Sequence, residues 1–211
     1  MIKYGLISEI DARTIEKTID LICEQFNEPI INVTEVGVYG GDTGFGITDY
    51  ICRTDKEGCF LTGVENNRDG EKNRTIYDKM LIGNSSEVYN QIKDDSQHLV
   101  FIDANHTFPA VIADFFCYST KVKPGGYIAF HDTGRHINPL HGWQGVGDKN
   151  DSDMCLGGVR KALTALSLLD YSFDFRDGIL YPNSYPGWEL IFDDADPLDE
   201  AGGVTVFKRL Y

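Results

Sequence analysis

The side chains best suited to chemistry stand where apolar runs of the sequence end. Asp103 follows the run HLVFI, and the pair His131-Asp132 follows the run YIAF. An apolar run that ends in a carboxylate is expected of a parallel strand buried on both faces. Parallel strands end at the same edge of a sheet, so these three side chains can converge there. Carboxylate oxygens with an imidazole make a site for a divalent cation such as Mg²⁺ or Mn²⁺.

A different interpretation of this pair stays open, in which His131 and Asp132 only form hydrogen bonds at a strand end.

His106 lies three residues after Asp103 in the sequence. An imidazole titrates near neutral pH and can take a proton from a hydroxyl group, so His106 is the candidate general base. A histidine in a loop can equally be a solvated residue.

A glycine-rich segment follows an earlier run of β-branched residues. The segment reads Glu35-Val-Gly37-Val-Tyr39-Gly40-Gly41. Glycines let a backbone approach a ligand closely, and the helix expected next offers unpaired N–H groups. A nicotinamide-binding protein would show G-x-G-x-x-G at the strand end, and this chain does not. The alternative is a turn that merely packs a helix on a sheet.

These segments resemble those of a known enzyme family. The pattern E-x-G-x-x-x-G at Glu35, Gly37 and Gly41 is similar to the first motif of class I S-adenosylmethionine-dependent methyltransferases. Residues 101–134 resemble the segment D-G-x-H-x-Y…D…L-x-P-G-G…H-D of the macrocin-like, rhamnosyl-like and cephalosporin-hydroxylase-like branch of the O-methyltransferases. Ala104 and Phe108 depart from that pattern. The matching residues are Asp103, His106, Asp114, Pro124, Gly125, Gly126, His131 and Asp132.

The resemblance implies a role for each part. The glycine-rich backbone would cradle the methionine portion of S-adenosylmethionine, the acid ending the second strand would hold the ribose hydroxyls, and the turn at 83–86 would contact adenine. The residues expected to bind the cofactor are Glu35, Gly37, Tyr39, Gly41, Glu65, Asn84, Ser85 and Asp103. In the metal-dependent members, residues at the positions of Asp103, His131 and Asp132 bind the metal that holds the substrate hydroxyl. A histidine at position 131 would favour Mn²⁺ or a softer ion.

The order of elements predicts an α/β fold. An amphipathic helix at 9–26 precedes five alternations of strand and helix, and the chain ends in a hairpin at 188–211. Asp42 or Thr43 is the expected N-cap of the helix after the glycine-rich segment, and the helix after Asp103 is expected to end at Pro124. A helix-like connection is expected at 67–79 and a strand at 171–175. We therefore expect one domain over 1–211, with a doubly wound, mostly parallel, seven-stranded Rossmann-like sheet and an antiparallel C-terminal hairpin strand. The stretch 133–157, rich in Gly, Asn, Asp and His without periodicity, is expected to be an active-site loop.

Composition excludes several classes of function. A formal net charge of -14 would repel a phosphate backbone, so nucleic acid is not the expected substrate. No apolar run approaches the roughly 20 residues that cross a bilayer. The five cysteines are scattered and never form C-x-x-C, which favours reduced thiols. The first residues lack the pattern of a signal peptide, so we expect a cytoplasmic protein, which could be a homo-oligomer.

The sequence thus predicts an S-adenosylmethionine-dependent O-methyltransferase, assisted by Mg²⁺ or Mn²⁺, that acts on a hydroxyl of a small molecule such as a sugar or natural product. Three alternatives remain. A nicotinamide-dependent oxidoreductase on a related fold is disfavoured by the missing motif. A metal enzyme of another class, such as a hydroxylase, would use His106, His131 and Asp132 as iron ligands. An inactive cofactor-binding protein would not need the set Asp103, His106 and Asp132.

Overall fold

The computed structural model describes residues 7–66, 75–133, 158–166, 168, 186–194 and 202–211. Three expectations fall mostly or wholly outside these residues. They are the helix-like connection at 67–79, the strand at 171–175 and the loop at 133–157, of which only Thr133 is described.

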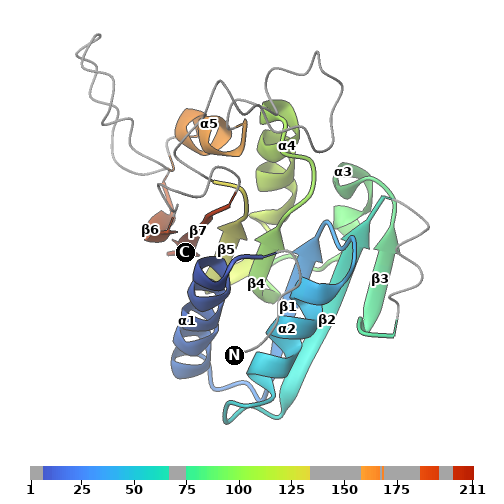
Figure 1. Cartoon of the computed structure of the whole chain (residues 1–211), viewed down its shortest axis with the longest axis vertical. Helices are drawn as coiled ribbons and strands as arrows, with labels where there is room; N and C mark the ends of the chain where they lie inside the picture. The colour runs from blue at the N-terminus through green and yellow to red at the C-terminus, as the bar shows by residue number, and fades with distance from the viewer. Residues whose placement is uncertain (1–6, 67–74, 134–157, 167, 169–185, 195–201) are drawn as a thin grey trace.

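The sheet is the predicted one, with seven strands in the order β3-β2-β1-β4-β5-β7-β6. The strands β1 to β5 run parallel, and β7 pairs antiparallel with both β5 and β6 (Figure 1). The strand bounds are β1 Ile30–Val36, β2 Gly58–Glu65, β3 Lys79–Ile82, β4 Gln97–Ile102, β5 Val122–Phe130, β6 Trp188–Asp194 and β7 Val204–Arg209. The predicted doubly wound sheet with its antiparallel C-terminal hairpin is therefore confirmed.

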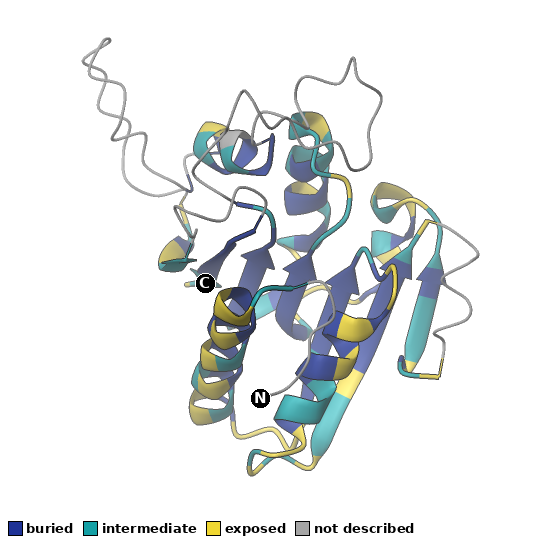
Figure 2. Cartoon of the chain, in the orientation of Figure 1, coloured by how far each residue is buried: buried dark blue, intermediate teal, exposed yellow. Residues whose placement is uncertain are grey.

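Helices cover both faces of this sheet and bury two apolar clusters against it. One cluster joins strand residues to α1 and α2, and the other joins them to α3, α4 and α5. The helix bounds are α1 Glu9–Gln25, α2 Asp42–Ile51, α3 Ser85–Val88, η2 Tyr89–Gln91, α4 Phe108–Tyr118 and α5 Gly158–Ala165. Figure 2 shows the central strands buried and the outer side of α1 exposed. Both faces of the central strands are therefore buried, and the polar side chains of interest lie at the strand ends.

Register aligns the carboxyl ends of three neighbouring strands. Val36 of β1 lies opposite Ile102 of β4, which lies opposite Phe130 of β5. The ladder continues one residue further, because Asp103 N donates to Val36 O at 2.8 Å and His131 N donates to Ile102 O at 3.0 Å. The residues that follow β1, β4 and β5 are therefore held side by side at one edge.

Two predicted element boundaries are wrong. The N-cap of α2 is Gly41, at φ 77° and without a side-chain hydrogen bond, and not Asp42 or Thr43. The helix expected to run to Pro124 ends at Tyr118. Pro124 lies inside β5, where the register shifts from Gln97 opposite Val122 to Leu99 opposite Tyr127. A proline is tolerated there because residues at such an irregularity leave the hydrogen-bonded ladder.

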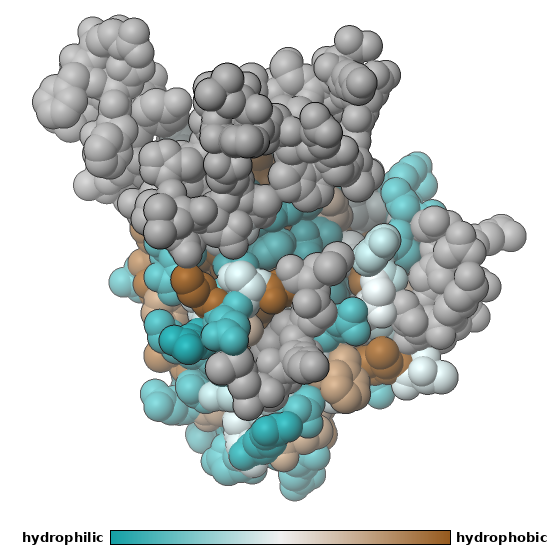
Figure 3. Space-filling view, viewed as in Figure 1, coloured by the Kyte–Doolittle hydropathy of each residue, from teal (hydrophilic) through white to brown (hydrophobic). Residues whose placement is uncertain are grey.

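The described surface is of mixed character. Figure 3 shows apolar side chains in separate brown patches among teal ones on the face that it presents. None of the described helices is both long and apolar enough to cross a bilayer.

Gly37, just after β1, lies against the backbone of Asp103, just after β4, and this close approach generates the first prediction. It has φ +92°, and a Cβ built there would lie 2.0 Å from the carbonyl oxygen of Asp103. We expect Gly37→Ala to lower the free energy of unfolding by at least about 2 kcal/mol in urea titrations, through strain and overpacking. Gly40→Ala is the control, because its nearest atom is the flexible Asp42 Oδ2 at 3.3 Å. Equal losses in the two variants would contradict the proposed close approach.

Candidate active site

The structure brings the three predicted metal ligands together. His131 Nδ1 lies 3.3 Å from Asp103 Oδ1 and 3.5 Å from Asp132 Oδ1. One ligand atom from each residue falls within 4.8 Å of the others. Asp132 has φ 56°, a left-handed conformation that costs a residue with a Cβ about 1–3 kcal/mol. The backbone after β5 is therefore held in an unfavourable conformation where it presents its carboxylate to the cluster.

His131 carries the observation that fits a cation. The residue is 8% exposed, and Nδ1 has no hydrogen-bond partner among the described residues, because the carboxylates nearby are close without hydrogen-bond geometry. A buried ring nitrogen without a partner is costly unless something binds it. Two carboxylates and an imidazole nitrogen that face one another form a donor set for Mn²⁺ or a similar ion.

His106 joins the same cluster from the loop between β4 and α4. Its Nε2 lies 3.2 Å from Asp103 Oδ1 and 3.2 Å from Asp132 Oδ2. The candidate base and the candidate ligands are thus in direct contact, and His106 stands between the two carboxylates.

The charges of the cluster shift one another's pKa values. Burial lowers the pKa of His131, but the carboxylates of Asp103 and Asp11 outweigh it and hold this pKa well above its usual range. Burial also lowers the pKa of His106, but Asp103 and Asp132 raise it more, so this pKa lies above its usual value. Burial raises the pKa of Asp103, yet both imidazoles bring it below its usual range. Burial dominates at Asp132, whose pKa is raised.

The glycine-rich loop lies beside this cluster and is tied to the end of β2. Gly37 and Gly41 have φ values of 92° and 77°, and Tyr39 has φ 42°. The Tyr39 N–H donates to Glu65 Oε2 at 2.9 Å. The carboxylate expected to hold the ribose is therefore positioned against the loop expected to hold the methionine portion.

Glu35 lies beneath the loop and not on its surface. Its side chain is 1% exposed and accepts hydrogen bonds from the Tyr77 hydroxyl, at 2.6 Å, and from the Gly44 N–H. Burial raises the pKa of this carboxyl to about 8, against the hydrogen bond of Tyr77. Glu35 can therefore support the start of α2, and its side chain is buried beneath the loop. Tyr77 was missed, and its position before β3 gave no signal of this contact.

The turn after β3 joins the site to α4. Asn84 is the N-cap residue of α3, and the Ser85 hydroxyl donates to Asp114 Oδ1 at 2.5 Å. Burial raises the pKa of Asp114 to about 6, while the bond from Ser85 lowers it. The Tyr118 hydroxyl donates to Ser85 O at 3.1 Å. The Ser85 side chain is thus engaged with α4, which fixes the turn.

Asp11 of α1 is a buried neighbour of the cluster that the sequence analysis missed. It is 1% exposed, and its Oδ2 lies 3.4 Å from His131 Nε2. The capping pattern of Ser8 and Asp11 can be read from the sequence. Its contact with a residue 120 positions away cannot.

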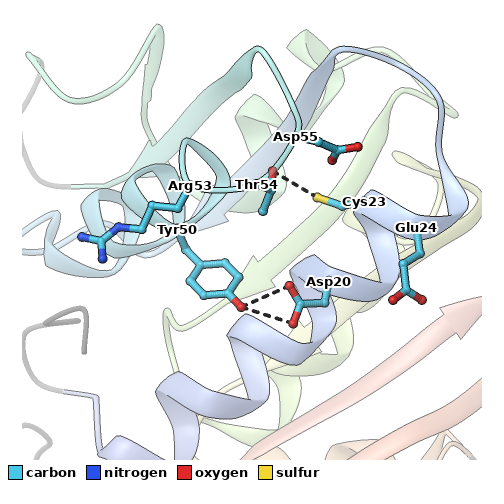
Figure 4. Close-up of a pocket in the computed structure, with 7 residues that line it drawn as sticks. All are labelled: Asp20, Cys23, Glu24, Tyr50, Arg53, Thr54 and Asp55. Atoms are coloured by element: carbon cyan, nitrogen blue, oxygen red, sulfur yellow. Dashed lines mark hydrogen bonds between the residues drawn. The ribbon is translucent and has the colours of Figure 1, made fainter.

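A separate hollow of ≈ 450 Å³ lies between α1 and α2 (Figure 4). Its polar groups pair with each other, because the Tyr50 hydroxyl donates to Asp20 and the Cys23 thiol lies 3.7 Å from Thr54 Oγ1. The residues come from the C-terminal half of α1, from Tyr50 near the end of α2 and from the residues just after α2. None of the predicted site residues lines this hollow.

Comparison with known protein families finds one match, which covers the part of the chain that holds this cluster. Residues 34–133 match a family model described as a methyltransferase domain. The matched segment begins in β1 and ends just after the His131-Asp132 pair. The part of the chain that carries the glycine-rich loop and the strand-end cluster is therefore similar to a methyltransferase domain. The alternative of a nicotinamide-dependent oxidoreductase is therefore not supported, and no curated protein matches the chain.

Solved structures share the methyltransferase fold at low identity. An O-methyltransferase from Bacillus cereus in complex with SAH is 14% identical with a TM-score of 0.60, over 99% of this chain and 84% of its own. The O-methyltransferase TomG from Streptomyces achromogenes, in complex with SAM, is 13% identical with a TM-score of 0.61, over 97% and 82%. MycE from the mycinamycin biosynthetic pathway, in complex with Mg and SAH, is 14% identical with a TM-score of 0.57, over 98% and 50%.

The buried carboxyl group of Glu35 generates a prediction on pH. Its pKa is raised from 4.5 to about 8, so the folded protein holds the proton more tightly than the unfolded chain. This contribution to stability is present below about pH 4.5 and is lost as the pH rises to 8. Between pH 5 and pH 8, the free energy of unfolding of Glu35→Gln should therefore rise relative to the parent by roughly 2–4 kcal/mol.

Urea unfolding at several pH values measures this difference. Glu24→Gln, at an exposed position near the end of α1, is the control and should follow the parent. A constant difference between Glu35→Gln and the parent across this range would show that Glu35 ionises in the folded protein as it does in the unfolded one.

Proposed function

We propose that the chain transfers the methyl group of S-adenosylmethionine to a hydroxyl oxygen of a small molecule, such as a sugar or a natural product, with the assistance of a divalent cation. The observation that supports this most is that His131 Nδ1 faces Asp103 and Asp132 beside the glycine-rich loop and has no hydrogen-bond partner among the described residues. The O-methyltransferase TomG belongs to tomaymycin synthesis and MycE was crystallised with Mg and mycinamycin VI, which supports the oxygen acceptor and the cation by analogy.

The cofactor would lie along the ends of β1, β2 and β3. The backbone from Gly37 to Gly41 would approach its methionine portion, and Glu65 would accept hydrogen bonds from the ribose hydroxyls. The Tyr39 N–H already donates to one oxygen of this carboxylate, Oε2, which holds it at the edge of the loop. Asn84 and the backbone at Ser85 would contact the adenine. Asp103 follows β4 and would contact both the cofactor and the cation.

The acceptor side would be organised by Asp103, Asp132 and His131 as ligands of Mn²⁺ or Mg²⁺. A divalent cation bound there would supply the positive charge that lowers the pKa of the acceptor hydroxyl. His106 would take the released proton at Nε2, the atom that faces both carboxylates. Asp103 and Asp132 raise the pKa of His106, and they would raise it less while they held a cation, so the ring would be neutral and able to accept. The methyl group then passes from sulfur to oxygen in one displacement.

The test of this function is methyl transfer with a labelled S-adenosylmethionine methyl group. Sugars and phenols would serve as acceptors, with Mn²⁺, with Mg²⁺ and with excess chelator. We expect transfer with a cation and a loss of at least about 10² in rate with chelator or in Asp132→Asn, because the hydroxyl is no longer activated. Calorimetry should show that cofactor affinity changes by less than about threefold.

Two outcomes would contradict this function. Full transfer in chelator by a protein without metal would leave the cluster as hydrogen bonding at a strand end. Oxidation of an acceptor by the iron-loaded protein, without methyl transfer, would support the hydroxylase alternative.

Glu65 provides a test of the cofactor side alone. Glu65→Ala removes a charge-assisted contact with two hydroxyls, so S-adenosylmethionine affinity should fall by about 1.5–3 kcal/mol, or one to two decades. Glu57→Ala is the matched control, because Glu57 is exposed just before the opposite end of the same strand. If calorimetry gives equal affinities for Glu65→Ala and the control, the ribose is not held at the end of β2.

A further inference from the structure

Asp11 of α1 is a buried carboxylate that the proposed reaction does not use directly, yet it contacts the centre of the site. Its Oδ2 lies 3.4 Å from His131 Nε2, on the side of the imidazole ring away from Asp103. Both side chains are buried, Asp11 at 1% and His131 at 8% exposed. The contact is therefore shielded from water, which strengthens a hydrogen bond between them.

The carboxylate of Asp11 is fixed by donors from two distant parts of the chain. Its Oδ2 accepts from the Ser8 hydroxyl at 2.7 Å and from the Ser8 N–H at 3.3 Å. Its Oδ1 accepts from the N–H of Gly203, next to β7, at 3.0 Å. Every one of these partners donates, so the oxygens act as acceptors and their orientation is determined before any ligand binds.

This arrangement decides which nitrogen of His131 carries a proton. An acceptor beside Nε2 requires a proton on Nε2 for a hydrogen bond. Nδ1 is then the nitrogen that can offer a lone pair, and it has no hydrogen-bond partner among the described residues while it faces Asp103 and Asp132. In metal sites, a second carboxylate that accepts from the far nitrogen of a ligating histidine fixes its tautomer and its ring orientation.

We propose that Asp11 is a positioning residue of the metal centre, which holds the Nε2 proton of His131 so that Nδ1 is directed at the cation. This inference rests on the metal site of the proposed function. It assigns a second task to a residue that also caps α1, where the Asp11 N–H donates to Ser8 Oγ at 3.2 Å. The N-terminal helix and the C-terminal hairpin thereby both support the ligand.

Metal affinity separates the contact of Asp11 with His131 from the effect of Asp11 on the N-terminus of α1. Asp11→Asn keeps the shape of the side chain but offers one acceptor oxygen to several donors, so Mn²⁺ affinity measured by calorimetry should fall about 10- to 100-fold. Mg²⁺ affinity should fall less, because imidazole is a better ligand for Mn²⁺ than for Mg²⁺. Glu9→Gln is the matched control, since it removes an exposed carboxylate from the first turn of α1 and leaves Asp11 opposite His131. Its Mn²⁺ affinity should stay within about threefold of the parent.

A loss in Glu9→Gln as large as that in Asp11→Asn would overturn the proposal, because the charge at the helix end and not the contact with His131 would then matter. An unchanged Mn²⁺ affinity in a folded Asp11→Asn variant would overturn it as well. Equal losses for Mn²⁺ and Mg²⁺ would also speak against it, since the imidazole would not be the affected ligand.

The tautomer of His131 gives a readout that needs neither activity nor a bound ion. Long-range ¹H–¹⁵N spectra of the metal-free, ¹⁵N-histidine-labelled parent, at a pH where the ring is neutral, should show the proton on Nε2. A proton on Nδ1 in the parent would overturn the proposal even if Asp11→Asn did not fold. A parent with the Nε2 proton that binds neither ion would refute the metal-assisted function itself, and the role of Asp11 at a metal would fall with it.

Discussion

The parallel register of β1, β4 and β5 is the constraint on which the site depends. It places Val36, Ile102 and Phe130 in one row, so that the next residues of β4 and β5, Asp103 and His131, emerge together. A slip of one residue between β4 and β5 would turn every side chain of one strand to the other face of the sheet. The two apolar clusters oppose such a slip, because each strand is buried on both faces. The packing of the core therefore sets the distances among Asp103, His131 and Asp132.

The cofactor side of the site depends on a second constraint, which is the close approach of backbones. Only a residue without a Cβ fits at position 37 against the carbonyl of Asp103. Below the loop, Glu35 joins the start of α2 to Tyr77, and above it Tyr39 bonds to Glu65. The loop is thus fixed from two sides before a ligand arrives, and a fixed loop loses less conformational entropy on binding.

The sequence could predict the features that repeat locally, and it could not predict contacts between distant residues. Apolar runs that end in polar residues located the ends of β4 and β5 and with them Asp103, His131 and Asp132. The N-cap of α2 was misplaced because Gly41 begins the helix through its backbone conformation, whereas the prediction looked for a capping side chain. Asp11 and Tyr77 were missed because their partners lie 120 and 42 positions away. No periodicity or motif encodes such pairs.

The charges of the cluster link metal binding to protons. Asp103 and Asp132 lie beside both His106 and His131 and raise the pKa of both imidazoles, and Asp11 raises the pKa of His131 further. Three carboxylates with two imidazolium ions carry a net charge of -1, and so do three carboxylates with one divalent cation and two neutral imidazoles. A cation bound there would therefore release protons without a change in net charge, since a ligating imidazole must be neutral. With its own proton released in this way, His106 would be able to take the proton of the acceptor hydroxyl in the proposed reaction.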